Sequence, residues 1–212
     1  PKKFIVIKES IFIKSFKLAK SNPNKTGLMA LFDALFLVSI FALYRLSLFF
    51  AQSIAIPATL SFAFIFIIFS LIYYLIVLFV YSFFKYSILD FIKSLFEATQ
   101  FSFKRLGQFY SLNIIIAGIF FAIMFSANFL LAGIKPEYRP FVFIFLAVPY
   151  LLFLYVIINT SHSLFYQGAS IKESIKNSFS ITFTKIKSYR ETILIMILFA
   201  LVLWILFLGS GY

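Results

Sequence analysis

The feature that most constrains this chain is a series of apolar stretches, each long enough to cross a lipid bilayer. A helix needs about 20 mostly apolar residues to span a membrane. Five stretches reach this length: 27–51, 57–84, 109–134, 140–167 and 191–209. The second of them contains no charged side chain at all. Because backbone polar groups cannot be left unpaired in lipid, we expect every stretch to be a helix.

The composition supports a polytopic membrane protein and argues against an ordinary soluble enzyme. Of the 212 residues, 63% are hydrophobic and 12% are charged, and the mean hydropathy is +1.04. Soluble domains contain about 45–50% apolar and about 25% charged residues. The chain has no cysteine and a single histidine, His162, which excludes disulfides, thiolate catalysis and a cluster of histidine or cysteine metal ligands.

The basic residues predict how the chain is oriented in the membrane. Most of the 19 Lys and Arg residues lie in three segments, 1–26, 85–108 and 168–190, whereas the loops on the other side contribute only Lys135 and Arg139. By the positive-inside rule, we expect a multi-pass protein of the cell membrane with a cytoplasmic N-terminus and an external C-terminus. An anionic inner leaflet, rather than nucleic acid, then accounts for the net charge of +12.

Each of the three basic segments also has an apolar face when it is placed on a helix of about 100° per residue. In the third segment this face comprises Ile171, Ile175, Phe179, Phe183 and Ile186. Helices of this kind lie in the headgroup plane of a bilayer. The sequence therefore predicts an all-α helix bundle of five spans with three amphipathic helices on the cytoplasmic face.

The predicted order, an amphipathic helix followed by two spans, indicates a tandem repeat within a single membrane domain over 1–212. The units would be 1–84, 85–167 and 168–212. Short matching fragments, such as Ser15-Phe16-Lys17 and Ser102-Phe103-Lys104, support duplication. The alternative is that any polytopic protein with basic inner loops looks periodic.

Three polar residues within the predicted spans form a candidate intramembrane site: Asp33, Asn113 and His162. An acid inside a span is costly and marks a functional site by default, but Asp33 can also pair with a basic side chain such as Lys25. His162 can carry protons or simply form a hydrogen bond at the end of its helix. Asn113 can form hydrogen bonds between helices.

Small residues spaced by four in the third predicted span form a candidate helix-packing face. These residues are Gly118, Ala122 and Ser126. Such a face lets a neighbouring helix approach closely.

The segment 170–179 (SIKESIKNSF), with the basic turn and the span that follow it, resembles a repeat found in certain uncharacterised multi-span membrane families. One of these is the membrane domain attached to some bacterial glycerophosphodiester phosphodiesterases. The resemblance extends over all three units and depends on helix type more than on identity. It implies an embedded, non-catalytic module, and no catalytic residue carries over from it.

No nucleotide-binding, metalloprotease or serine-hydrolase motif occurs in the chain, so we expect no enzyme activity, catalytic residue, cofactor or metal. The sequence favours a scaffold, anchor or accessory subunit of a membrane complex, which packs with a copy of itself or with another membrane protein. A small transporter or channel is the alternative, suggested by the repeat, Asp33, Asn113 and Pro149. A lipid-modifying enzyme that uses His162 or Asp33 is the second alternative.

Overall fold

A computed structural model describes residues 11–53, 60–94, 100–185, 189–191, 193–195, 197–198 and 202. Nearly all of these residues are helical, and no strand occurs among them, which confirms the predicted all-α class. The principal helices are α1 (Ile11–Ser21), α2 (Pro23–Ser53), α3 (Leu60–Lys93), α4 (Phe103–Ala132), α5 (Arg139–Tyr166) and α6 (Ile171–Lys185).

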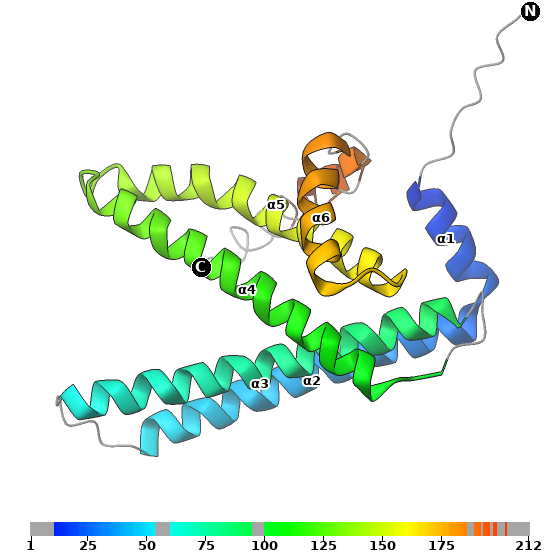
Figure 1. The fold of residues 1–212 in the computed structure, drawn as a ribbon, viewed down its shortest axis with the longest axis horizontal. Helices are drawn as coiled ribbons and strands as arrows, with labels where there is room; N and C mark the ends of the chain where they lie inside the picture. The colour runs from blue at the N-terminus through cyan, green and yellow to red at the C-terminus, as the bar shows by residue number, and fades with distance from the viewer. Residues whose placement is uncertain are drawn as a thin grey trace, which may run out of the picture.

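The long helices form two hairpins that meet at one end (Figure 1). Helices α2 and α3 run side by side in opposite directions, and α4 and α5 form the second hairpin. Helix α4 crosses α3 near the C-terminal end of α3 and then diverges from it (Figure 1). The start of α2, the end of α3, the start of α4 and the end of α5 all lie at the end where the hairpins meet, and we call this region the junction.

Local chemistry explains where several helices begin and end. Helix α2 begins at Pro23, a position where proline loses no helical hydrogen bond. The Thr26 hydroxyl donates to the carbonyl oxygens of Ala19 at 3.1 Å and Asn22 at 3.0 Å, which ties α1 to α2. Between α4 and α5, the Arg139 guanidinium donates to the carbonyls of Ile134 and Ala132. The carbonyl of Ala132, the last residue of α4, would otherwise have no intrahelical partner.

Three helices are long and apolar enough to cross a membrane: 23–50, 64–93 and 103–129. They coincide with the first three predicted stretches, and they support the predicted membrane character. The fourth predicted stretch is helical as α5, although it is not among these three. Most of the fifth stretch, 191–209, lies outside the described residues, so the number of five spans stays a prediction.

The structure differs from the prediction over the second amphipathic segment, 85–108. We expected one interfacial helix there, but α3 continues to Lys93 and α4 already begins at Phe103. The apolar faces of these residues are therefore used at the junction between two long helices. Helix α1 covers residues 11–21 of the first segment, the start of α2 covers 23–26, and α6 covers much of the third segment. The tandem repeat stays a prediction.

The buried core lies at the junction and along the start of the α4–α5 hairpin. Its members come from α3, α4 and α5: Tyr86, Leu106, Phe109, Leu112, Ile116, Phe120, Ile157 and Phe165. Helix α6 packs against both α5 and α4, with Ile171, Ile175 and Phe179 against this core. Ile171, Ile175 and Phe179 on the apolar face of α6 are half-buried, whereas Phe183 on the same face is exposed, so an interfacial position of this helix stays a prediction.

Candidate intramembrane polar site

A chain of hydrogen bonds joins α3, α4 and α5 inside the core. The Asn113 side-chain amide donates to the Ser82 hydroxyl at 2.9 Å, and Ser82 donates to the Leu78 carbonyl at 2.6 Å. On the other side, His162 Nε2 lies 2.7 Å from Asn113 Oδ1. Because an amide oxygen can only accept, His162 Nε2 is the donor in this pair. Two of the three predicted site residues are therefore in direct contact.

The three side chains of this polar chain are almost completely buried. The exposed fraction is 0% for Ser82, 4% for Asn113 and 1% for His162. The helix period explains the burial of Asn113, since it shares one face of α4 with Phe109 and Ile116. A buried polar group left without a partner costs about 1–3 kcal/mol, so loss of Asn113 would affect both of its neighbours.

Aromatic rings surround the histidine. The ring of Phe109 lies 4.5 Å from that of His162, and the ring of Tyr81 lies 6.2 Å away, both measured between centroids. Phe165 packs on Phe109 at 5.7 Å. These ring contacts restrict the imidazole beside its hydrogen bond to Asn113.

Asp33, the third predicted residue, is exposed on α2 and is connected to the site through charge rather than through a hydrogen bond. Its negative charge acts on Lys85 of α3, and Lys85 in turn acts on His162. The expected partner was Lys25, which precedes Asp33 on its own helix. Sequence reasoning missed Lys85 because its proximity to Asp33 depends on how α2 and α3 pack.

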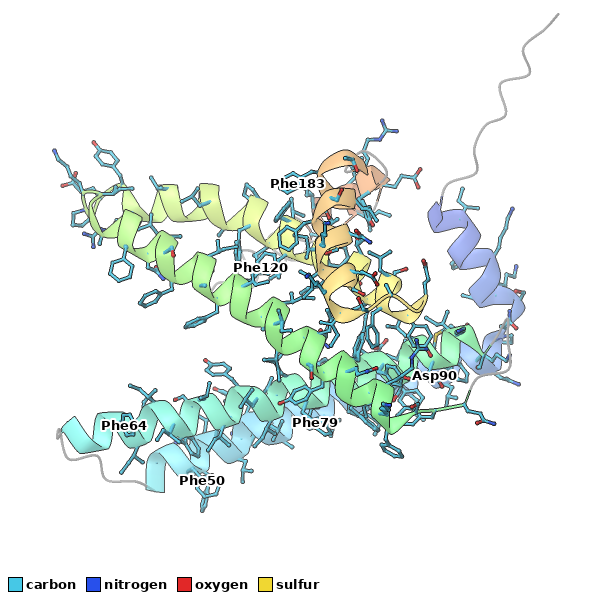
Figure 2. All side chains as sticks on the ribbon, in the orientation of Figure 1. Phe50, Phe64, Phe79, Asp90, Phe120 and Phe183 are labelled. Carbon is cyan, nitrogen blue, oxygen red and sulfur yellow. The ribbon has the colours of Figure 1, made fainter. Side chains whose placement is uncertain are left out.

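A second polar group lies closer to the end of α3. The Tyr166 hydroxyl of α5 donates to the Asp90 carboxylate of α3, and the ammonium group of Lys93 lies 5.6 Å from the centre of the Tyr166 ring. Asp90 lies at the junction, far from Phe50 and Phe64 at the other end of the first hairpin (Figure 2). These contacts add a second connection between α3 and α5, beside the one through Asn113.

A cavity of about 570 Å³ opens between these two helices. Its polar lining comprises Lys85 and Lys93 from α3, Asn159, His162, Ser163 and Tyr166 from α5, and Gln167 directly after α5. The sequence contained a signal for the α5 half of this lining, because the polar run at 159–163 follows a long apolar stretch. Sequence reasoning missed the α3 half, because the basic residues of 85–108 predicted a separate interfacial helix.

Hydroxyl side chains line the contact between α5 and α6. Ser174, Ser178 and Thr182 follow one another at intervals of four on α6, and each is completely buried. Among the described residues, the buried Oγ atoms of Ser161 and Ser174 and Nδ1 of His162 have no hydrogen-bond partner. Sequence reasoning missed this contact, although the α6 hydroxyls recur at the same interval of four as the small residues of α4.

The predicted packing face on α4 has no partner among the described residues. Gly118, Ala122 and Ser126 are exposed, and a Cβ added at Gly118 would meet no atom within 4 Å. These residues lie on the side of α4 opposite to Phe109, Ile116 and Phe120, which face the core. We refer to Gly118, Ala122 and Ser126 as the small-residue face.

Within the part of the chain that the structure describes, no group of three His, Asp or Glu side chains is placed to hold a metal ion. Comparison with protein families, with curated proteins and with solved structures finds no match to this chain.

Proposed function

We propose that this membrane protein is a non-enzymatic scaffold, anchor or accessory subunit of a membrane assembly, and that it binds its partner through α4. A single observation carries this proposal: the small-residue face of α4 is exposed and contacts none of the described residues. Apolar side chains gain little from leaving lipid for a protein surface. Association of membrane helices therefore depends on close packing at small residues and on hydrogen bonds between helices.

The position of this face supports an external partner. The opposite side of α4 already contributes Phe109, Ile116 and Phe120 to the core, so a second helix can contact the small-residue face without disturbing internal packing. Close approach also needs room near the backbone, and Gly118 has no neighbour that a side chain would meet. The partner is a helix of a second copy or of another membrane protein.

Substitution of the face by a larger residue tests the proposal. In the double variant Gly118→Leu and Ala122→Leu, the added side chains hold a partner helix away from the α4 backbone. We expect the assembly of the full chain, measured by crosslinking in native membranes and by mass in mild detergent, to be reduced at least about tenfold. The control is Ala42→Leu, which adds the same side chain to an exposed position on α2.

Two results would contradict this function. One is an assembly that is unchanged in the double leucine variant. The other is a wild-type chain that remains monomeric and retains no other membrane protein during purification. A reduction of equal size in Ala42→Leu would show a general effect of added leucine, and it would also count against a specific α4 contact.

A small transporter or channel is the second candidate, and the charges near the polar site favour it. Asp33, Lys85 and His162 interact electrostatically across α2, α3 and α5, and ionisable residues within spans often belong to substrate or ion pathways. Flux into liposomes that contain the wild-type chain or Asp33→Asn tests this function. We expect a flux that the substitution lowers, and the absence of flux for ions and small solutes would contradict transport.

A further inference from the structure

We propose that the cavity between α3 and α5 is a binding site for a phosphate group, carried either by an anionic phospholipid headgroup or by free phosphate. The observation behind this proposal is that Lys85 and Lys93 line one cavity together with Ser163 and Asn159. Its volume, about 570 Å³, falls within the range of about 300–1,000 Å³ that is usual for small-molecule sites.

The lining residues of α3 come from one face of that helix. Lys85, Leu89, Ile92 and Lys93 follow the i, i+4, i+7, i+8 pattern, so all of them are directed toward α5. The two ammonium groups are carried on flexible four-carbon stems, which allows them to converge on one ligand. The contact of Lys93 with the Tyr166 ring shows that its ammonium group reaches across to α5.

The charge of the lining favours an anion. No acidic residue lines the cavity, whereas two lysines do. Asp90 accepts a hydrogen bond from Tyr166, and the charge of Asp33 acts on Lys85 from α2. Neither acid is among the lining residues, so the charged groups that a ligand meets in the cavity are the two ammonium groups.

Neutral donors on α5 complete the site. Ser163 accepts a hydrogen bond from the Gln167 amide at 3.2 Å, so its own hydroxyl hydrogen is available to a ligand. The Asn159 amide uses one of its two hydrogens in a bond to the Tyr155 carbonyl at 2.9 Å and retains the other. Ammonium, hydroxyl and amide donors that line one cavity suit the several acceptor oxygens of a phosphate group.

The remaining wall and the location of the cavity suit a phospholipid. Leu89 and Ile92 provide an apolar wall beside the lysines. The cavity lies at the junction, the end of the molecule that the charge pattern predicts to face the cytoplasmic leaflet, and basic pockets between helices on that side are suited to anionic lipid headgroups. Free phosphate shares the recognition chemistry but not the need for an apolar wall.

Binding to the full-length chain in neutral detergent micelles tests the proposal, with microscale thermophoresis as the measurement. The probes are dioctanoyl phosphatidylglycerol, dioctanoyl phosphatidylcholine and inorganic phosphate. We expect phosphatidylglycerol to bind at least tenfold more tightly than phosphatidylcholine. The double variant Lys85→Gln and Lys93→Gln should weaken this binding by about tenfold or more, because it removes both charged donors.

Two further variants separate a specific site from general effects. Lys104→Gln removes an exposed lysine of α4 at the same end of the molecule, and it should change binding less than twofold. Ile92→Trp keeps both lysines but fills the cavity, and it should also weaken binding about tenfold. Helix content and a monodisperse elution profile check that each variant is folded. If the double glutamine variant does not fold, the binding measured for Ile92→Trp tests the proposal.

The phosphate probe identifies the source of the ligand. Competition between inorganic phosphate and phosphatidylglycerol at the wild-type site would show that free phosphate suffices, and binding of phosphatidylglycerol without competition would assign the site to lipid. The proposal is overturned if neither anion binds. It is also overturned if folded variants of the cavity bind as tightly as the wild type, or if Lys104→Gln weakens binding as much as they do.

Discussion

The far part of the α2–α3 hairpin and the junction of α3, α4 and α5 are stabilised in different ways. In α2 and α3, none of the residues in the most apolar stretch is buried, and the two helices meet in the far part through aromatic rings such as those of Phe50 and Phe69. At the junction, Ser82, Asn113 and His162 are buried and joined by hydrogen bonds. Apolar side chains can face lipid at no cost, so polar pairs and close packing determine where helices of this chain associate.

The largest expected difference between the two regions comes from removing an aromatic side chain. Phe109 is completely buried at the junction, whereas Phe64 is 65% exposed near the start of α3. Phe109→Ala should lower the free energy of unfolding by about 3 kcal/mol through lost packing, and Phe64→Ala should change it by about 0.5 kcal/mol or less. Unfolding by denaturing detergent in mixed micelles measures both values. Similar losses for the two variants would contradict the distinction.

Removal of the central amide of the polar chain should have the next largest effect. Asn113→Ala leaves His162 Nε2 without its acceptor and removes one of the two hydrogen bonds of Ser82, and it should lower the free energy of unfolding by about 1–3 kcal/mol. Asn128 is exposed on the same helix, so Asn128→Ala is a matched control with an expected change of about 0.5 kcal/mol or less. If Asn113→Ala behaves like the control, the hydrogen bonds do not hold the junction together.

Removal of one hydroxyl group, that of Tyr110, tests a single hydrogen bond where α3 and α4 cross. Tyr110 of α4 donates to the Leu75 carbonyl of α3 at 3.0 Å, while Tyr74 is exposed one residue before that carbonyl. Tyr110→Phe should lower the free energy of unfolding by about 0.6 kcal/mol, the usual value for a hydrogen bond between membrane helices. The same unfolding assay should show no change for Tyr74→Phe, and a loss of the same size there would argue against this contact.

The smallest expected effect concerns the start of α6, outside the long apolar helices. The Ser170 backbone N–H and hydroxyl both donate to the Glu173 carboxylate, at 3.0 and 2.8 Å, and Glu173 N–H donates back to the Ser170 hydroxyl at 3.3 Å. This capping box satisfies donors that would otherwise lack an intrahelical partner. The two hydrogen bonds from Ser170 lower the pKa of Glu173 below its ordinary value of 4.5, and the bond from the backbone N–H has the larger effect.

A carboxyl group with a lowered pKa stabilises the folded state above its unfolded pKa and loses this contribution as the pH falls through the folded value. The first turn of α6 should therefore open more often below about pH 4.5. Hydrogen exchange of the α6 amides, corrected for the intrinsic pH dependence, measures this opening. Glu173→Gln retains a capping side chain that does not titrate, so its exchange should lack the acid-dependent increase. An equal increase in both proteins would exclude Glu173 as the cause.

Much of the fold could be predicted from the sequence, but the continuity of the helices could not. The apolar stretches 27–51, 57–84 and 109–134 predicted three helices that the structure contains as α2, α3 and α4. The basic residues of 85–108 suggested a separate interfacial helix. The structure instead extends α3 and begins α4 within this segment, because Tyr86, Leu106 and Phe109 pack together in the core.

The sequence by itself determined that these segments are helical and apolar, and which side chains share a face of each helix, because both follow from the composition of each segment and the helix period. It thereby identified Asn113 and His162 as candidates. Only the tertiary structure decided that Asn113 contacts Ser82 and His162, that Lys85 is near Asp33, and that the small-residue face of α4 points away from the core. These outcomes depend on where the helices cross and on how each helix is rotated about its axis. Both are determined by contacts between residues that are distant in sequence.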